Sequence, residues 1–524
     1  MRISGLRQLR NFSIYYRNEK SVTTNKSTIF ALSSGFGKCG VAVIRVSGPD
    51  VKKALTEIGG FKQLPTPRKA MLKKLSDPVT KEVLDQGLVV WFPGPNSFTG
   101  EDSCEFQVHG GSAVISAVLQ ALRKLDNFCP AEPGEFTKRA FYSGKMDLTS
   151  VEGLSALIDS ETEIQRKQAL HQMEGALYSL YNGWSDKLIK SLAHLEAYID
   201  FDEDQDIDKD VIENINSNIT SLIVDIKKHL EDGRRGERIR KGVQMTILGA
   251  PNSGKSSLMN ILCKRPAAIV SSIPGTTRDL VETHLDINGY PVNVTDTAGL
   301  RVDPADQVEA EGISRAISSA MSSDFILFIF DVVKFVEWTK ENGYNLDSLE
   351  ALQKYVQCNE LGIQEQIQQC QDLWNYIFNN ENCYSNGKTQ GLILFNKMDL
   401  LSSEDNLSFL KQNDCYNFIS GISCKTEEGI AELIERMTNK LETLCGKSAS
   451  IQNNPSYSSS RQRHCLEECL TSLQQFSKLS VEGFQVDLTA ETLRRAIDSL
   501  GRLTGRISTE QLLDIIFKDF CIGK

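Results

Sequence analysis

One octapeptide has residue types and spacing that suit a bound triphosphate. Residues 249–256 read GAPNSGKS and lie between the apolar run 243–248 and the helix-like run 257–262. A strand, a glycine-rich loop and a helix in that order bring backbone N–H groups and the positive end of the helix toward an anion. Lys255 would meet the β- and γ-phosphates, and Ser256 would bind magnesium. We expect a nucleoside triphosphate site here; the alternative is an ordinary strand-to-helix turn.

Four further motifs follow in an order that favours guanine as the base. They are residues 276–277 (TT), 296–299 (DTAG), 396–399 (NKMD) and 423–425 (SCK). Asn396 and Asp399 suit the edge of guanine, because a carboxylate can accept from the ring N–H and the amino group, which adenine lacks. An Asn-Lys-x-Asp tetrapeptide alone is usually a polar loop, but the ordered set predicts a GTPase.

The residues expected at the nucleotide come from all of these motifs. Asp296 would reach the magnesium shell, and the N–H of Gly299 would approach the γ-phosphate. Ser256 and Thr277 would bind magnesium, and Thr277 would also take part in catalysis. The expected set is Gly249, Asn252, Ser253, Gly254, Lys255, Ser256, Ser257, Ser271, Thr276, Thr277, Asp296, Thr297, Ala298, Gly299, Asn396, Lys397, Asp399, Ser423, Cys424 and Lys425.

The composition is that of an ordinary globular protein of several domains. The chain has 524 residues, of which 40% are hydrophobic and 24% charged, and its formal net charge is −10. The length predicts about two to four domains. The negative charge gives no overall attraction to nucleic acid, so any RNA contact must be local or made by a partner. No apolar run is long enough to span a bilayer, and we expect no membrane association.

The 13 cysteines are scattered and show no paired C-x-x-C spacing. This pattern fits a reducing compartment rather than a disulfide scaffold. Cys465 and Cys469 stand beside His464 on a helix-like run, and we interpret them as core packing rather than as a metal site.

The first 30 residues are basic and carry a single acid, Glu19. Together with the interleaved hydroxyl residues, this is typical of an organelle transit peptide, which we place at 1–27. A disordered basic tail is the alternative interpretation.

The periodicity of the remaining chain predicts a multidomain protein with α+β and α/β parts. Strand-like runs with a helix near 113–125 indicate a small α+β domain over 28–148. Helical spacing dominates 149–241, beginning with an expected capping box of Thr149 and Glu152. The GTPase unit is expected over 242–447, with an unusually long insertion at 336–388. Residues 448–524 are again helical, so we expect the GTPase unit to be inserted into one helical domain.

Two charged segments need an interpretation of their own. The acidic run 200–210 is expected to be a solvated loop rather than a calcium loop, because the required glycine and glutamate are not at the right places. The cluster 234–241 contains five Arg or Lys residues. It is either a hinge or a phosphate contact, and the residues do not favour one over the other.

Motifs outside the phosphate loop resemble the MnmE/TrmE family of tRNA-modification GTPases. They are residues 98–102 (FTGED), 108–111 (VHGG), 133–141 (PGEFTKRAF), 145–148 (KMDL) and the terminal 521–524 (CIGK). The resemblance spans nearly the whole chain after the transit segment and departs from the family in the insertion 336–388. With the basic N-terminus, the chain is similar to the mitochondrial member of the family.

The resemblance implies addition of a carboxymethylaminomethyl or taurinomethyl type group to carbon 5 of the wobble uridine of mitochondrial tRNAs, in the matrix. It implies a flavoprotein partner of the MnmG type that carries FAD. It also implies a tetrahydrofolate one-carbon donor, in the 5,10-methylene or 5-formyl form, bound by an N-terminal domain that forms a homodimer. Local tRNA contacts would come from Lys138, Arg139 and 461–464.

Four residues match the folate positions of the family, namely Arg45, Glu105, Lys145 and Lys524. A carboxylate such as Glu105 suits two N–H groups of a pterin, and Arg or Lys suits the glutamate tail of a folate. Arg45 and Lys145 are equally compatible with ordinary surface cations.

Cys521 matches a catalytic thiol of the family, as nucleophile, acid or relay. The terminal tetrapeptide is a poor prenylation box because of Gly523 and Lys524. For GTP hydrolysis, Leu300 stands where many GTPases place a water-positioning glutamine, and the resemblance assigns that role to Glu309. It also implies potassium in place of an arginine finger, held by Asn252, Ser271, Ile273 and Thr276.

Two other functions compete with this interpretation. A GTPase that only switches, such as an assembly factor for the organelle ribosome, would share the nucleotide motifs but would need neither the folate-type residues nor Cys521. A membrane-remodelling GTPase would need a lipid anchor or a basic amphipathic helix, and the sequence has neither.

Overall fold

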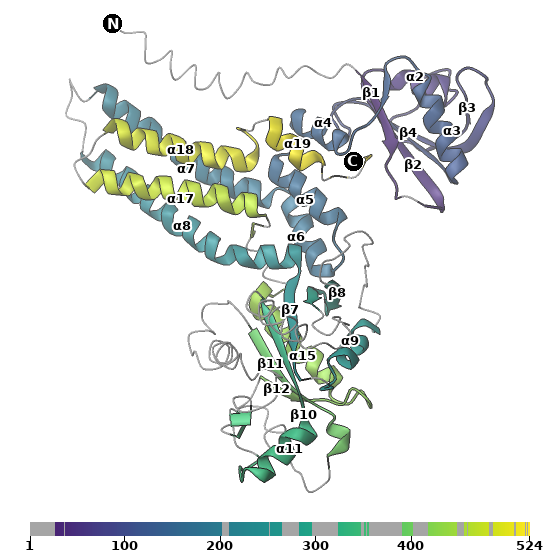
Figure 1. Ribbon diagram of the computed structural model, residues 1–524. Coiled ribbons are helices and arrows are strands. Elements are labelled where there is room, and N and C mark those ends of the chain that lie inside the picture. Colours follow the sequence, from purple (N-terminus) through teal and green to yellow (C-terminus); the bar gives the residue numbers. More distant parts are fainter. Residues whose placement is uncertain are drawn as a thin grey trace, which may run out of the picture. The chain divides into compact units, whose positions relative to one another are not determined.

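The computed structural model describes most of the chain in two compact units (Figure 1). The described residues are 27–35, 37–201, 209–250, 252–264, 282–295, 323–346, 351–352, 354–355, 390–401, 418–447, 455–457, 459–481, 486–507, 510–518, 520 and 522–523. The first unit comprises Met1–Ser155, Gln172–Lys227 and His464–Lys524. The second comprises Ala156–His171 and Lys228–Arg463.

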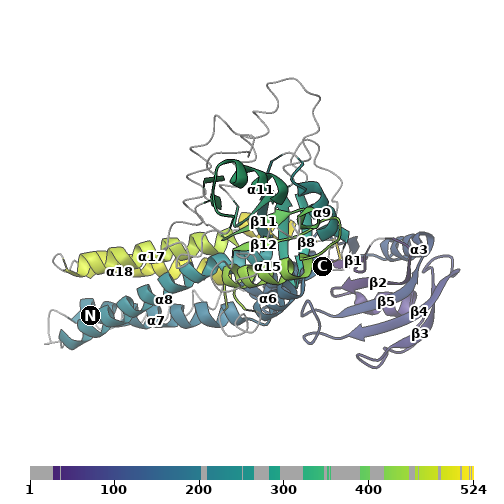
Figure 2. The same ribbon diagram turned by 90° about the horizontal axis from the view of Figure 1, so that it is seen from below.

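The first unit contains a six-stranded sheet with the order β3-β4-β5-β2-β1-β6. Its strands are β1 (Thr28–Leu32), β2 (Cys39–Ser47), β3 (Met71–Ser76), β4 (Val83–Phe92), β5 (Ser103–Gly110) and β6 (Phe128–Pro130). Because side chains alternate along a strand, residues such as Ile44 and Phe106 face one side of the sheet. There they form a buried core with α2 (Val51–Glu57) and α3 (Ser112–Arg123), and Figure 2 shows α3 against that side.

Helices from both ends of the chain form a bundle in the first unit. They are α7 (Ala176–Phe201), α8 (Lys209–Lys241) up to residue 227, α17 (Ser460–Val481) from residue 464, and α18 (Val486–Thr504). Figures 1 and 2 show these helices side by side. Buried leucines of α17 and α18, among them Leu473 and Leu493, supply the apolar stripes that the sequence predicts.

Shorter helices α4 (Glu135–Tyr142), α5 (Leu148–Ile158) and α19 (Glu510–Lys518) complete the first unit. Leu148 and Val151 pack against Leu513 and Phe517. The expected capping box is wrong in its detail: Thr149 lies inside α5, and the carboxylate of Asp147 accepts from the backbone N–H of Thr149 at 2.8 Å. Asp147, which directly precedes α5 and lies two residues before Thr149, satisfies the first free N–H groups of the helix.

The second unit contains a six-stranded sheet with the order β12-β11-β10-β7-β9-β8. The strands are β7 (Val243–Leu248), β8 (Glu282–Ile287), β9 (Tyr290–Thr295), β10 (Phe325–Asp331), β11 (Gln390–Asn396) and β12 (Ile419–Gly421). All pairs are parallel except β8 with β9. In such a sheet, ligands bind beyond the carboxyl ends of the strands.

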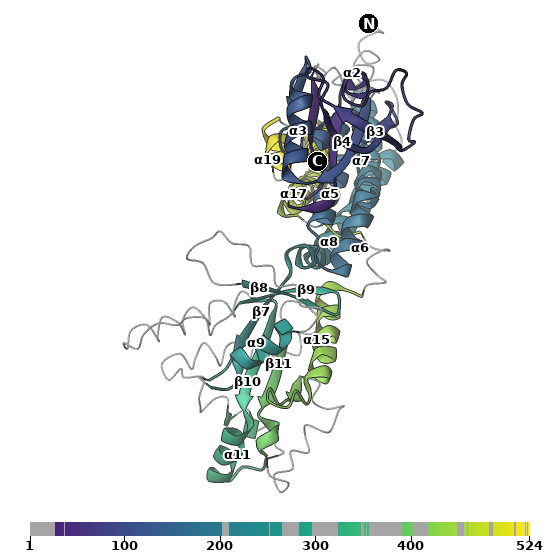
Figure 3. The same ribbon diagram turned by 90° about the vertical axis from the view of Figure 1, so that its right-hand side faces the viewer.

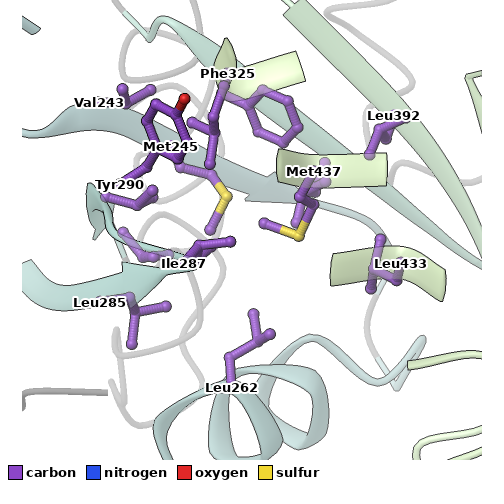
Figure 4. Close-up of a cluster of buried hydrophobic side chains, with 14 of the residues drawn as sticks. Val243, Met245, Leu262, Leu285, Ile287, Tyr290, Phe325, Leu392, Leu433 and Met437 are labelled. Carbon is purple, nitrogen blue, oxygen red and sulfur yellow. The ribbon is translucent and has the colours of Figure 1, made fainter. Parts of the chain in front are cut away.

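Helices α9 (Lys255–Lys264), α11 (Val332–Glu341) and α15 (Ile430–Cys445) belong to the same unit. Figure 4 shows one core of the unit, in which Met245 and Phe325 of the strands face Leu433 and Met437 of α15. Helix α6 (Glu163–Met173) adds Ile164 to this core. Figure 3 shows α9 and α15 beside the strands.

The expected insertion 336–388 begins inside α11 rather than after it. Val336 and Thr339 are buried, and Val336 follows Phe335, which packs against Phe395 of the sheet with ring centroids 5.0 Å apart. The first residues of that range therefore belong to the packed unit. Residues 356–389 lie outside the described residues.

The predicted fold class is confirmed: a small α+β part is followed by a helical part, into which an α/β unit with a mostly parallel sheet is inserted. Among the helices that the structure describes, none is both long enough and apolar enough to cross a membrane.

Candidate functional site

The phosphate loop connects β7 to α9 at the carboxyl edge of the second sheet. Two of its residues have left-handed backbone conformations, with φ of 64° at Asn252 and 108° at Gly254. The ammonium group of Lys255 donates to the carbonyl oxygens of Gly249 and Ala250, at 2.7 and 2.9 Å. The lysine therefore lies across the same loop whose N–H groups would receive phosphates.

Two glycines let this loop approach its neighbours. A Cβ at Gly249 would collide with the carbonyl oxygen of Ile329 in β10, and a Cβ at Gly254 would collide with the amide of Asn396 in β11. Only glycine fits both places. The side-chain oxygen of Ser253 is buried without a hydrogen-bond partner in the part of the chain that is described.

Asn396 joins three motifs that are far apart in the sequence. It stands at the end of β11 and is only 2% exposed. Its Nδ2 donates to the carbonyl oxygen of Ser253 at 2.8 Å, and its Oδ1 accepts from the backbone N–H of Cys424 at 3.0 Å. The amide that the sequence places at the edge of guanine is thus engaged in holding the phosphate loop to the loop 423–425.

Asp399 is oriented by a buried hydroxyl. The Oγ of Ser423 donates to the Oδ1 of Asp399 at 2.7 Å, and it accepts from the backbone N–H groups of Lys425 and Thr426. Asp399 itself is exposed. One carboxylate edge is therefore fixed by the protein, and the group faces solvent where a base would lie.

Lys397 and Cys424 support this loop. Lys397 has φ of 68°, and its ammonium lies 2.5 Å from the carboxylate of Asp331, which also caps α11. Burial raises the pKa of the Cys424 thiol to about 11, while a hydrogen bond with Asn396 acts in the opposite direction. The thiol stays protonated near neutral pH and is a poor nucleophile.

Several predicted site residues lie outside the described residues. They are Ser271, Ile273, Thr276, Thr277, Asp296, Thr297, Ala298, Gly299, Glu309, Cys521 and Lys524. Strand β9 ends at Thr295, directly before Asp296, and runs parallel to β7. Its carboxyl end therefore points to the same edge of the sheet as the phosphate loop.

A contact at the base of this unit was not expected from the sequence. Asn293 of β9 donates from Nδ2 to the carbonyl oxygen of Lys241, the last residue of α8, at 2.7 Å. Its Oδ1 lies 2.7 Å from Nδ1 of His284 in β8. Gly242 has φ of 85°, and a Cβ there would meet the Asn293 amide. A glycine just after a long helix is the signal that could have indicated this junction.

Some cationic side chains of the cluster 234–241 are exposed to solvent, and at least one is buried. Arg238 is 9% exposed, and its Nε lies 2.8 Å from a carboxylate oxygen of Asp324, so its charge is paired inside the second unit. Arg234, Arg240 and Lys241 are exposed. The structure thus supports neither of the two interpretations over the other for the cluster as a whole.

In the first unit, Arg45 of β2 and Glu105 of β5 are cross-strand neighbours. Nε of Arg45 lies 3.1 Å from Oε1 of Glu105, and both side chains are about one-fifth exposed, 21% and 20%. The guanidinium carbon of Arg45 lies 5.0 Å from the ring centre of Phe98 and 5.8 Å from that of Phe136. Arg45 is therefore not an ordinary surface cation, whereas Lys145 is exposed.

The loop 98–102 beside Arg45 is held by a buried arginine. Arg139 is 8% exposed and binds the carboxylates of Glu101 at 3.0 Å and Glu135 at 2.9 Å. The Oγ of Ser47 also donates to Glu101, at 3.0 Å. The expectation that Arg139 contacts tRNA is wrong, because its charge is neutralised inside the unit. Lys138 is paired with Asp514 at 2.6 Å.

Two family models match the chain. The model described as the MnmE helical domain matches residues 148–521, and the model described as the N-terminus of the GTP-binding protein TrmE matches residues 28–145. Together they account for almost all of the chain beyond its first 27 residues.

Curated relatives are similar along almost the whole chain. A Danio rerio protein named 5-taurinomethyluridine-tRNA synthase subunit GTPB3, mitochondrial, is 46% identical over 95% of this chain and 93% of its own length. The Homo sapiens protein of that name is 44% identical, with 95% and 93% covered. The tRNA modification GTPase MnmE of Parvibaculum lavamentivorans is 41% identical, with 95% and 100% covered.

Proposed function

Because the chain belongs to the MnmE/TrmE family of tRNA modification GTPases, we propose that it takes part in modifying the wobble uridine of mitochondrial tRNAs. The observation that carries the proposal is the similarity along almost the whole chain to relatives named as a 5-taurinomethyluridine-tRNA synthase subunit or as a tRNA modification GTPase. The group added to carbon 5 is of the taurinomethyl type, as in the names of the animal relatives. The protein acts in the matrix, with 1–27 as its transit peptide.

The chain is a GTPase by its family. Lys255 and the N–H groups of residues 252–257 would hold the phosphates, Ser256 and Thr277 would bind magnesium, and Asp399 would read guanine. Glu309 would orient the attacking water, since Leu300 cannot. Asn396 would act indirectly, by holding the loops on both sides of the nucleotide together.

Asp399→Asn is expected to weaken GTP binding by about 100-fold, because two hydrogen bonds from guanine to a carboxylate are replaced by one acceptor and one opposing N–H₂ group. The Ser423 hydrogen bond to Oδ1 can persist, so the loop keeps its shape. Binding of GTP and XTP is measured by displacement of a fluorescent nucleotide. XTP, which carries an oxygen in place of the amino group, should bind the variant better than GTP does.

The matched control for this substitution is Asp225→Asn, at an exposed position on α8. It should leave both affinities unchanged. A variant at Asp399 that still prefers GTP over XTP would show that another residue reads the base.

We place a tetrahydrofolate derivative, the source of the added carbon, at Arg45 and Glu105. The donor set fits: a mostly buried carboxylate accepts from N–H groups, and the guanidinium beside it is paired only through Nε among its described contacts. The partly exposed ring of Phe98 would give a flat ligand an apolar surface beside that guanidinium, whereas Phe136 is fully buried and packs against Arg45 from inside the unit. Lys145 and Lys524 would meet the carboxylates of the glutamate tail.

Glu105→Gln is expected to weaken binding of 5-formyltetrahydrofolate by about 10- to 100-fold, because a charged acceptor is lost while the shape is kept. Isothermal titration of the purified chain measures it. Glu57→Gln, in an exposed pair with Lys81 of the same unit, is the control and should bind as the wild type does. Equal affinities for all three proteins would show that the folate derivative does not bind at Arg45 and Glu105.

The remaining partners follow from the same proposal. The subunit naming of the relatives supports a second subunit, which we take to be an FAD-dependent protein of the MnmG type. The N-terminal part, 28–148, would form the homodimer, and 149–241 with 448–524 would be the helical domain around the GTPase unit 242–447. An assembly factor for the organelle ribosome would need no folate, so the titration also separates that alternative.

A further inference from the structure

The last described residues of the chain are attached to the N-terminal sheet by backbone contacts. Ile522 forms an isolated antiparallel bridge with Pro133. The hydroxyl of Ser33 donates to the carbonyl oxygen of Gly523 at 2.8 Å, across 490 positions of sequence. All four residues belong to the first unit. The C-terminal tail is thus held at the end of β1.

Glycine is required at position 523 for this attachment. Its φ is 97°, which other residues rarely adopt, and a Cβ would collide with the carbonyl oxygen of Leu32. Gly523 is buried, whereas the side chain of Ile522 is 48% exposed. Apolar burial of Ile522 therefore contributes little, and the attachment depends on the backbone bridge and on the Ser33 hydroxyl.

The register of the sheet places Ser33 near the pair formed by Arg45 and Glu105. Ala31 is the cross-strand partner of Arg45, and the N–H of Ser33 donates to the carbonyl oxygen of Val43 at 2.8 Å. Ser33 directly follows β1, and this hydrogen bond continues the register of the strand pair, so Ser33, two residues after Ala31, lies on the same side of the sheet as Arg45. Two residues correspond to about 7 Å along the strand. The tail is therefore attached beside the proposed folate site.

We propose that Ser33 is a positioning residue that clasps Gly523 and so holds the C-terminal tail beside Arg45 and Glu105. The clasped pair, 522 and 523, is preceded in sequence by Cys521 and followed by Lys524. The inference rests on the proposed function, in which Cys521 supplies a thiol and Lys524 meets the folate derivative. Ser33 touches neither the folate nor the reacting atoms; it acts through the tail.

Hydrogen exchange of the C-terminal peptide in the full-length protein tests the clasp. Ser33→Ala should make this peptide exchange about tenfold faster, because one hydrogen bond of this kind shifts the ratio of attached to released tail by about that factor. Ser33→Thr keeps the hydroxyl and should restore slow exchange. Peptides from β2 and β5 should exchange alike in all three proteins, which shows that the sheet is intact.

Gly523→Ala breaks the same attachment from the other side and should speed exchange of the same peptide. In the complete complex with its partner subunit, Ser33→Ala should slow wobble-uridine modification about tenfold, Ser33→Thr should restore it, and GTP turnover should stay unchanged in both.

Two results would overturn the inference. Slow exchange in Ser33→Ala would mean that the hydroxyl does not hold the tail. Fast exchange with an unchanged modification rate would mean that the clasp positions nothing of importance. Failure of the proposed function itself would look different, because the wild-type complex would then modify no uridine.

Discussion

Replacing potassium by sodium is expected to lower GTP turnover by about 1,000-fold, the lower end of what an arginine finger contributes. Loose phosphoryl transfer depends on neutralising charge around the phosphates rather than on covalent help. We propose that potassium supplies this charge, held by Asn252 and by Ser271, Ile273 and Thr276. Turnover is measured as phosphate release at equal ionic strength in either salt.

The described part of the site supports a role for Asn252 in holding the potassium ion. It is exposed, its left-handed backbone places it at the bend of the phosphate loop, and its side chain makes no hydrogen bond within the described contacts. Its amide oxygen is therefore available to a cation. Oxygen ligands of this kind suit hard cations.

Asn252→Ala is the matched variant for the salt experiment. It should reduce turnover in potassium to the level seen in sodium and change turnover in sodium little, while GTP binding persists. Rubidium, which is close to potassium in size, should restore most of the wild-type rate. Equal wild-type turnover in potassium and sodium would remove the cation from the mechanism and require another source of positive charge.

The phosphate loop could be predicted from the sequence because its chemistry is local. A strand, a glycine-rich loop and a helix within about 20 residues suffice to form the anion site. The structure confirms this order, from β7 through Gly249 and Gly254 to α9. Strands β7, β10 and β11 of the second sheet were likewise predictable, since buried parallel strands are continuous apolar runs such as 325–330 and 392–395.

Contacts between distant segments could not be predicted in the same way. The sequence places Asn396 at the edge of guanine, but it does not reveal that its amide also bonds to Ser253 and Cys424, 143 and 28 positions away. No periodicity in one sequence records such a contact. The junction of Asn293 with Lys241 was missed for the same reason.

The roles of charged residues were the least predictable, because a buried charge pairs with an opposite charge inside the protein and is no longer available to a partner. Arg139 lies in a basic motif and looked like an RNA contact, yet two carboxylates neutralise it inside the first unit. The pair of Arg139 with Glu135, four residues earlier on the same helix, could be expected from helical spacing. The pair with Glu101, which is far away in the sequence, could not. Arg45 and Lys145 could not be told apart from the sequence either. Only the structure shows that aromatic rings pack against Arg45, whereas Lys145 is exposed.

The central claim is that one chain joins a GTPase to a thiol that takes part in uridine modification. Cys521→Ser is therefore expected to abolish modification and to leave GTP turnover unchanged. A serine hydroxyl replaces the thiol with little change in size, but it ionises far less readily and is a much weaker nucleophile and acid. Cys129→Ser, at an exposed cysteine of the same unit, is the control and should be fully active.

Mass spectrometry of the wobble uridine in mitochondrial tRNA tests this claim most directly. The tRNA comes from cells whose only copy of the protein is wild type, Cys521→Ser or Cys129→Ser, and from cells with no copy. We predict a taurinomethyl-type uridine in the wild type and in Cys129→Ser, and an unmodified carbon 5 in the other two. Normal modification in cells that lack the protein would contradict the proposed function, and normal modification in Cys521→Ser alone would remove the thiol from the reaction.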